Sequence, residues 1–281
     1  MAHLERFAPS PTGYLHLGHA FSALTAWKHA QAADGVFLLR IEDFDYNRVR
    51  VEFEQAIYED LHWLGLDWPE PVLRQSDNLT VYAAALNSLQ EMGLTYACEC
   101  TRADIKAATS PPVLGPDGIV YPGTCRNKGL ASNENTIRLN MNKAIEHLGG
   151  ASMVNRLHFT ETNDGELHYF LDDNHLLTNC GDIILARRDV GTSYHMAVVI
   201  DDAAQNVTHV TRGQDLFEAT QIHRILQELL GLQTPIYCHH RLILDKNGKR
   251  LAKRDDSRAI RKYRSDGATA QDIRAMVGLD W

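Results

Sequence analysis

Two short segments far apart in the chain carry the residues best suited to chemistry. Near the start, His16 and His19 stand on either side of a glycine at the expected beginning of a helix, where backbone N–H groups and the helix dipole favour phosphate. Near the end, the run Lys249–Arg254 follows a Lys-Asn-Gly turn and clusters several cations. Imidazoles and cations around a triphosphate would stabilise the charge that develops during attack at the α-phosphorus. Together the segments predict ATP chemistry, although each one alone is typical of an ordinary charged surface.

The sequence lacks the two commonest nucleotide-binding motifs, the Gly-x-x-x-x-Gly-Lys-Ser/Thr loop and the Gly-x-Gly-x-x-Gly fingerprint. ATP would therefore be held in another way. The expected ATP-binding residues at the helix start are His16, Gly18 and His19, and Lys253 is the expected cation for the β and γ phosphates. His16, His19 and Lys253 are accordingly the candidate catalytic residues.

The elements that must position these residues follow from the apolar periodicity of the first hundred residues. Strands are expected near residues 4–8, 36–41 and 72–75, and helices near residues 18–33, 51–64 and 79–92. This alternation is typical of a parallel α/β sheet, in which the loops at the carboxyl ends of the strands lie together. The Pro-Ser-Pro-Thr-Gly loop would lie at such an end.

The alternation stops after Tyr96, in a stretch rich in proline and glycine, and resumes near Tyr194 after several β-like runs. One Rossmann-type nucleotide-binding fold with an insertion explains this order better than two unrelated domains. The predicted division is residues 1–96 for the first half of the nucleotide-binding fold, 97–180 for an inserted connective subdomain, 181–245 for the second half, and 246–281 for the cationic loop and a short C-terminal helical extension.

Composition narrows the class of protein. The chain has 281 residues and a formal net charge of -8, which argues against general coating of nucleic acid. No apolar run approaches the length of a membrane span, and the amino terminus has no signal-peptide pattern. Five cysteines, an odd number, indicate reduced thiols rather than a disulfide framework. We therefore expect a cytoplasmic α/β protein that acts neither at a membrane nor with an obligate protein partner.

Four ordered segments resemble the signatures of glutamate-specific class I aminoacyl-tRNA synthetases. They are Arg6–Gly13 (RFAPSPTG), His16–His19 (HLGH), Arg40–Asp43 (RIED) and Arg250–Arg254 (RLAKR). The resemblance covers nearly the whole chain, and it implies a class I synthetase fold that binds ATP with Mg²⁺ between the second and fourth segments. It also implies a reaction in which the carboxylate of L-glutamate attacks the α-phosphate and gives an aminoacyl adenylate.

The resemblance further implies a glutamate pocket and one departure from the family pattern. The glutamate-binding residues would be Arg6, Ala8, Ser10, Glu42, Tyr194 and Arg212. Arginine forks suit the two carboxylates of glutamate, and Glu42 would hold the ammonium group. Ala252 stands where the family generally has serine, so we expect slower activation.

A cysteine cluster supplies three soft metal ligands, Cys98, Cys100 and Cys125. A structural zinc site needs four ligands. The pattern Cys-x-Cys…Tyr-x-x-x-Cys resembles the zinc element of short paralogues in this family, which implies that Tyr121 completes a site for one structural Zn²⁺. The alternative is three buried, reduced cysteines beside a core tyrosine.

The segment after the cationic loop bears on the RNA acceptor. Few residues follow Arg264, whereas conventional glutamyl-tRNA synthetases continue into anticodon-reading domains. The likeness to the short paralogues implies transfer of glutamate to queuosine in the anticodon stem-loop of tRNA(Asp). The expected RNA-binding residues are Arg258, Arg261, Lys262 and Arg264, although a solvated charged tail would look alike. Two alternatives stay open, a shortened synthetase that charges a tRNA 3′ end and a non-catalytic paralogue that binds RNA or glutamate.

Overall fold

Alternating strands and helices form the first part of the molecule, as the apolar periodicity predicts. The structure is a computed structural model that describes residues 2–132, 134–244, 258–279 and 281. The elements begin with β1 (Leu4–Phe7), α1 (Leu17–Ala32), β2 (Val36–Ile41), α2 (Val51–Trp63), β3 (Leu73–Arg74), a 3-10 turn (Gln75–Asn78) and α3 (Leu79–Glu91).

The middle of the chain contains shorter strands, in line with the expected loss of alternation. It contains β4 (Thr95–Cys98), α4 (Arg102–Ala108), β5 (Leu114–Gly115), β6 (Gly118–Ile119), β7 (Thr136–Leu139), α5 (Met141–His147), α6 (Ala151–Val154), β8 (His158–Glu161), β9 (Leu167–Phe170), α7 (Asp173–His175), a π-helical turn (Leu176–Cys180) and β10 (Ile184–Ala186). The chain then continues with α8 (Tyr194–Ala204), β11 (His209–Gly213), a 3-10 turn (Gln214–Leu216), α9 (Ala219–Leu230), β12 (Ile236–His240), α10 (Ile260–Ser265) and α11 (Ala270–Met276).

The chain forms two compact units, each assembled from separate stretches. The first unit comprises Met1–Asp77, Val207–Asp215 and Ile236–Trp281, and the second comprises Asn78–Asn206 and Leu216–Pro235. A compact unit of the chain is not by that fact a nucleotide-binding fold. The functional division at residues 96, 180 and 245 therefore stays a prediction.

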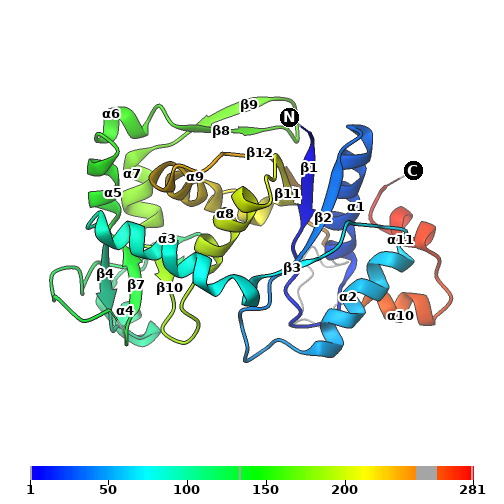
Figure 1. Cartoon of the computed structure of the whole chain (residues 1–281), viewed down its shortest axis with the longest axis horizontal. Coiled ribbons are helices and arrows are strands. Elements are labelled where there is room, and N and C mark those ends of the chain that lie inside the picture. The colour runs from blue at the N-terminus through cyan, green and yellow to red at the C-terminus, as the bar shows by residue number, and fades with distance from the viewer. Residues whose placement is uncertain (1, 133, 245–257, 280) are drawn as a thin grey trace. The chain divides into compact units, whose positions relative to one another are not determined.

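A parallel sheet organises the first unit, with its strands in the order β3-β2-β1-β11-β12. Helix α1 packs on β1, β2 and β11 through small and branched residues such as Ala23 and Leu24, both fully buried (Figure 1). Ile260 of α10 and Ile273 of α11 join the same core and are fully buried. The expected C-terminal extension is therefore part of the hydrophobic core of the first unit.

The second unit combines small antiparallel sheets with three packed helices. Strands β10, β7 and β4 form an antiparallel sheet, and β5 pairs with β6 and β8 with β9 as hairpins. Helices α3, α8 and α9 pack on one another, and the Tyr82 hydroxyl of α3 donates to the buried Asp201 carboxylate of α8 at 2.8 Å. Among the described residues, no helix is both long and apolar enough to cross a lipid bilayer.

Candidate active site and cysteine cluster

The two histidines of the first segment form the cap of α1. The Nδ1 atom of His16 accepts a hydrogen bond from the Gly18 N–H at 3.1 Å, and the Nδ1 atom of His19 accepts one from the His16 N–H at 3.1 Å. A neutral imidazole carries one ring proton, so Nε2 is the protonated nitrogen in both rings. The ring centroids lie 3.8 Å apart. The cap therefore uses Nδ1 of each ring as an acceptor, and Nε2 of each ring carries the proton that contact with a phosphate would require.

The His16 ring leaves little space for a side chain at Gly18. A Cβ atom at Gly18 would lie 3.0 Å from Cε1 and 3.1 Å from Nδ1 of the His16 ring. Helix α1 has no acidic residue in its first turn, so the positive end of its dipole is not neutralised there. The start of α1 thus has the electrostatic character of an anion site.

The cationic segment that contains Lys253 lies outside the described residues. The chain resumes beside the histidine cap, because Ala259 forms a β-bridge with His16 and the Ile260 N–H donates to the Leu15 carbonyl at 2.8 Å. The part of the chain that directly follows the cationic segment is therefore anchored at the start of α1.

Two adjacent carboxylates of the third segment have different environments. Asp43 accepts hydrogen bonds from both the backbone N–H (2.8 Å) and the hydroxyl (2.6 Å) of Ser76. Glu42 is 9 % exposed, and its Oε1 lies 3.7 Å from Nη2 of the fully buried Arg40. Its backbone N–H donates to the Pro9 carbonyl at 3.1 Å. Asp43 is thus a structural residue, whereas Glu42 lies against the loop that contains Ala8 and Ser10.

Arg212 is held in the sheet by its neighbours on β12. Its side chain is buried, its Nε donates to Nε2 of His239 at 3.0 Å, and its guanidinium lies 5.1 Å from the centroid of the Tyr237 ring. The rings of Tyr237 and His239 are stacked, with centroids 5.8 Å apart. Because the Nε bond fixes the plane of the guanidinium, its terminal nitrogens have a defined direction in which to meet a carboxylate.

Most of the predicted glutamate residues lie at one edge of the first unit. Ala8 and Ser10 follow β1, Glu42 follows β2, and Arg212 is near the end of β11. These strands are parallel, so their carboxyl ends share an edge of the sheet, the usual place for a ligand in this architecture. Arg6 belongs to β1 itself and is 4 % exposed.

Tyr194 belongs to the second unit, and its place in the glutamate pocket stays a prediction. It is the first residue of α8, next to the N-cap Ser193, and its ring is partly exposed. The ring packs against His195 and His223, with centroid distances of 5.5 Å and 5.7 Å.

The cysteine cluster of the second unit brings four candidate ligand atoms together. The three Sγ atoms of Cys98, Cys100 and Cys125 lie within 4.8 Å of one another, with 3.4 Å between Cys100 and Cys125. The Tyr121 hydroxyl lies 3.3 Å from the Cys98 Sγ and 3.5 Å from the Cys100 Sγ. In a tetrahedral zinc site with Zn–S distances of about 2.3 Å, neighbouring ligand atoms stand about 3.8 Å apart. The cluster therefore fits a zinc ion, and the three cysteines could hold one.

Proton affinities within the cluster differ between its members. Burial acts to raise the pKa of the Cys125 thiol, but hydrogen bonds from the Tyr121 hydroxyl, the Glu99 backbone and the neighbouring thiols lower that pKa to about 7. Burial raises the pKa of Cys100. Burial and the thiols raise the pKa of Tyr121, so its hydroxyl stays protonated at neutral pH. Cys125 is thus the thiolate that would meet a metal first, and metal binding would release the remaining thiol protons.

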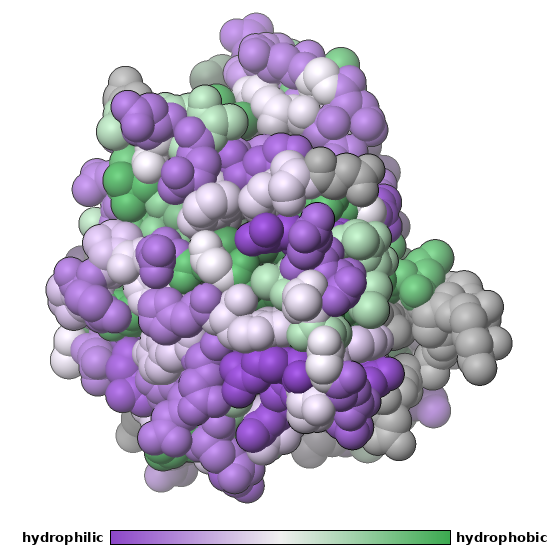
Figure 2. Space-filling view, turned by 90° about the vertical axis from the view of Figure 1, so that its right-hand side faces the viewer, coloured by the Kyte–Doolittle hydropathy of each residue, from purple (hydrophilic) through white to green (hydrophobic). Residues whose placement is uncertain are grey.

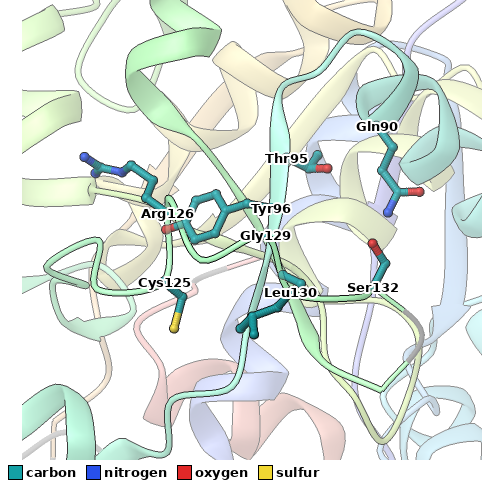
Figure 3. Close-up of a pocket in the computed structure, with 9 residues that line it drawn as sticks. Gln90, Thr95, Tyr96, Cys125, Arg126, Gly129, Leu130 and Ser132 are labelled. Carbon is teal, nitrogen blue, oxygen red and sulfur yellow. The ribbon is translucent and has the colours of Figure 1, made fainter.

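A polar cavity opens beside Cys125. It has a volume of about 450 Å³, and Figure 3 shows its lining residues with Cys125 at one side of the group. Two of them, Tyr96 and Arg126, donate hydrogen bonds of 2.6 Å to the buried Asp182 carboxylate. A metal site needs an entry path for the ion, and this cavity reaches one of the cysteines, Cys125.

The four basic residues of the expected RNA segment have unequal surroundings. Asp266 pairs with Arg258 and with Lys262, and Arg264 lies 3.8 Å from Glu59. Arg261 is exposed, and its guanidinium lies 4.5 Å from the centroid of the Tyr14 ring.

A cavity of about 510 Å³ lies among the basic residues of α10. Its lining residues are Tyr14, Ala259, Arg261, Lys262, Arg264 and Ser265. Hydrophilic side chains dominate the face of the molecule seen in Figure 2, the side on which α10 and α11 lie in Figure 1. The cavity therefore combines cations with one aromatic ring, which is a suitable surface for a phosphate chain.

A buried carboxylate lies under this basic helix. Asp60 of α2 is 1 % exposed, and its Oδ2 has no hydrogen-bond partner among the described residues. Burial raises its pKa to about 6, although the charges of Arg264 and Arg261 act to lower it. The folded state therefore binds the Asp60 proton more tightly than the unfolded chain does.

We expect Asp60→Asn to stabilise the protein at pH 7 by about 2 kcal/mol, because the folded chain then no longer holds a buried charge. Since the pKa is raised on folding, the wild type should lose stability as the pH rises from about 4 to about 6. The gain from Asp60→Asn should therefore shrink towards pH 4. Denaturant unfolding of both proteins at several pH values measures this, and a constant difference would contradict the assignment.

Two residues beside the site were not among the predicted site residues. Arg40 belongs to the RIED segment, and in the structure it is the buried cation beside Glu42. A charged residue inside the apolar strand Val36–Ile41 is the signal that could have identified it. His239 has no such signal, because its role depends on the strand register that places it opposite Arg212.

Comparison with known proteins identifies the family to which the chain belongs. Residues 4–279 match the family described as "tRNA synthetases class I (E and Q), catalytic domain". The chain belongs to this family of class I aminoacyl-tRNA synthetases, and it is an ATP-dependent ligase. Class I synthetases use ATP with Mg²⁺, and the family implies an amino acid and tRNA as the other substrates.

Individual proteins of known name are similar to the chain over most of its length. A protein from Rhodobacter capsulatus named Glutamyl-Q tRNA(Asp) synthetase is 52 % identical, over 98 % of this chain and 100 % of that protein. A protein of the same name from Nocardia farcinica is 41 % identical, over 97 % of this chain and 82 % of its own length. The crystal structure of glutamate-tRNA synthetase from Elizabethkingia anophelis matches all of this chain with a TM-score of 0.77 and 26 % identity, and the chain spans 62 % of its length.

Proposed function

We propose that this enzyme activates L-glutamate with ATP and transfers the glutamyl group to queuosine in the anticodon of tRNA(Asp). The observation that supports this acceptor is the match over the full length of a relative whose name specifies Glutamyl-Q and tRNA(Asp). A ligase of this kind would work in the cytoplasm, where tRNA is present.

In the proposed activation step, a carboxylate oxygen of glutamate attacks the α-phosphorus of ATP. The new bond is the acyl–phosphate bond of glutamyl adenylate, and pyrophosphate leaves. The Nε2–H groups of His16 and His19 would donate to phosphate oxygens as charge develops on them. Lys253 would neutralise the departing phosphates, a role that rests on the sequence because this residue lies outside the described ranges.

The proposed glutamate pocket uses charge complementarity. Arg6 and Arg212 would bind carboxylates, while Glu42 would accept hydrogen bonds from the ammonium group and Tyr194 would complete the pocket. Both arginines are nearly fully buried, and glutamine lacks the side-chain carboxylate that would form charge-assisted hydrogen bonds with them, so it would be rejected. In the second step, a queuosine hydroxyl oxygen would attack the adenylate carbonyl carbon and AMP would leave.

Activation and the acceptor are tested by one assay with labelled glutamate. The enzyme is incubated with ATP and with tRNA(Asp) that either contains or lacks queuosine. We expect label only on the queuosine-containing tRNA. Equal labelling of both, together with protection of the 3′-terminal ribose from periodate oxidation, would identify a synthetase that charges the tRNA 3′ end. Absence of glutamate-dependent ATP–pyrophosphate exchange would identify a non-catalytic paralogue.

We further propose that Cys98, Cys100, Tyr121 and Cys125 hold one structural Zn²⁺. A site made of Zn²⁺, three thiolates and one neutral phenol has a net charge of −1. The Arg138 guanidinium lies 3.9 Å from the centroid of the Tyr121 ring, where it would compensate that charge. The ion would crosslink a loop-rich stretch that includes only short strands and helices.

We expect Cys125→Ser to abolish stoichiometric zinc and to lower the thermal midpoint by about 5–15 °C, as loss of a structural metal costs several kcal/mol. Metal analysis of untagged protein and thermal unfolding with and without chelator are the measurements. Cys180→Ser is the matched control, because Cys180 is buried outside the cluster. Zinc-free wild-type protein with an unchanged midpoint would contradict the proposal.

For the RNA, we propose that the α10 cavity contacts phosphates and that Arg261 contributes most. Arg261→Ala should weaken tRNA binding by about fivefold and reduce the salt slope of binding by about one. Lys262→Ala is the control, because its Nζ is 2.6 Å from Asp266 and we expect a smaller loss. Binding at several salt concentrations measures both, and ATP–pyrophosphate exchange should be unchanged. An equal loss in both variants would argue against a special role of Arg261.

A further inference from the structure

Three titratable side chains form a continuous hydrogen-bonded chain in the second unit, and the proposed reaction assigns them no role. They are Asp117 at the tip of the β5–β6 hairpin, His195 on α8 and His223 on α9. Nε2 of His195 lies 2.9 Å from each carboxylate oxygen of Asp117, and Nδ1 of His195 lies 3.0 Å from Nε2 of His223. His195 is 3 % exposed and His223 is 1 % exposed. Buried polar groups in such a chain have few alternative partners and therefore hold one another in fixed orientations.

The proton positions in this chain follow from the acceptor at its end. Partial desolvation acts to raise the pKa of Asp117, but the hydrogen bond and charge of His195 lower it, so Asp117 is a carboxylate and can only accept. His195 therefore donates through Nε2. When His195 is neutral, its Nδ1 must accept, and His223 donates to it through Nε2. With a neutral His195, the Asp117 charge thus sets the direction of both hydrogen bonds.

The two imidazoles form the support of the Tyr194 ring. Tyr194 packs on His195 with an interplanar angle of 63° and on His223 with an angle of 56°. The imidazoles also contact each other, with centroids 5.2 Å apart. A rotation of either imidazole would therefore remove a surface on which the Tyr194 ring rests.

The hairpin that presents Asp117 is fixed by close backbone contact. A Cβ atom at Gly115 would lie 1.9 Å from the carbonyl oxygen of Asn179, and one at Gly181 would lie 2.6 Å from Cγ1 of Val120. Only glycine permits these approaches. The Asp117 carboxylate is consequently held at His195 by the fold of the hairpin and not only by its own hydrogen bonds.

We propose that Asp117, His195 and His223 form a positioning relay that fixes the Tyr194 ring and thereby sets the affinity of the enzyme for glutamate. The inference rests on the proposed role of Tyr194 in the glutamate pocket. The relay residues are positioning residues, because they act on the substrate through Tyr194. The relay also makes glutamate binding depend on a hairpin of the inserted stretch.

The test compares two replacements of His223 in the whole 281-residue chain. His223→Gln keeps an N–H donor close to the position of Nε2, whereas His223→Leu removes it at similar volume. In ATP–pyrophosphate exchange we expect His223→Leu to raise the KM for glutamate about tenfold with the KM for ATP and kcat within about twofold, and His223→Gln to stay near wild type. A purely structural role would not separate the two KM values in this way.

Asp117→Ala provides a variant that folds even if His223→Leu does not, since the Asp117 side chain is 53 % exposed. It should raise the KM for glutamate about fivefold. Asp189→Ala is its matched control, because Asp189 is 50 % exposed and also pairs with a single basic residue, Arg187. An unchanged glutamate KM in Asp117→Ala, or an equal rise in Asp189→Ala, would overturn the relay.

Tyr194→Ala separates failure of the relay from failure of the proposed function. A rise in its glutamate KM together with the expected His223→Leu result supports both. A rise without a response in His223→Leu or Asp117→Ala overturns the relay alone. No rise in Tyr194→Ala overturns the glutamate role of Tyr194 and, with it, the relay.

Discussion

Replacing His16 with Asn is expected to slow glutamate-dependent ATP–pyrophosphate exchange by about 100- to 1000-fold, the usual loss when one preorganised donor to a developing charge is removed. The Asn side-chain oxygen can accept from the Gly18 N–H as Nδ1 of His16 does, and Asn is a favourable N-cap. The thermal midpoint should therefore stay within about 2 °C of the wild type. Exchange kinetics and thermal unfolding on the same preparation measure the two effects.

A second replacement, His16→Gln, serves as the control, because it keeps a donor and loses the cap acceptor. The Gln amide can reach the position of Nε2 but leaves the Gly18 N–H without the cap acceptor, so we expect a loss of about 1 kcal/mol in stability and a smaller loss of rate. The two variants thus separate the capping role of the ring from its donor role. If His16→Asn retained full exchange activity, the phosphate role of His16 would be refuted.

Arg212→Gln is expected to lower kcat/KM for glutamate by roughly 1000-fold, equivalent to about 4 kcal/mol, because truncating one partner of a buried charge pair leaves the other unpaired. The KM for ATP should change little. Arg212→Lys keeps the charge but not the planar fork, so we expect it to recover only part of the activity. Steady-state exchange with glutamate or ATP as the varied substrate gives both constants.

His239→Gln is the control for Arg212, since a Gln oxygen can accept from Nε of Arg212 in place of the imidazole. We expect its glutamate KM to stay within about threefold of the wild type. Glutamine should not replace glutamate as substrate in the wild type. Efficient activation of glutamine, or normal glutamate activation in Arg212→Gln, would contradict the pocket assignment.

The sequence predicted the elements of the first unit well, and the reason is physical. Strands such as Val36–Ile41 are short apolar runs, and helices such as α1 follow them at regular spacing, so local periodicity determines both. The histidine motif was placed at a helix start because a cap has a local signal. What the motif did not show was which ring nitrogen faces the backbone, because that depends on hydrogen bonds formed only in the folded helix.

Other features of the site depend on contacts between distant residues and had no local signal. His195 and His223 belong to separate helices, and Asp117 belongs to a short hairpin, so no spacing rule connects them. The four basic residues near α10 looked equivalent in the sequence, and only the structure distinguishes Arg261 on Tyr14 from Lys262 paired with Asp266. The Lys262–Asp266 pair has the local i,i+4 spacing, whereas the contact of Arg261 with Tyr14 joins residues far apart in the sequence and depends on tertiary packing.

The assembly of the first unit from separate stretches has a consequence for protein synthesis. Strands β1 and β2 leave the ribosome early, but β11, which pairs with the other side of β1, follows only after residue 206 and β12 only after residue 235. Until then, one edge of β1 has no sheet partner in the nascent chain, a state that favours aggregation. The edge that carries Ala8, Glu42 and Arg212 can therefore form only after β11 has left the ribosome. The ligase should thus gain its capacity to bind glutamate late, after most of the second unit has had time to fold.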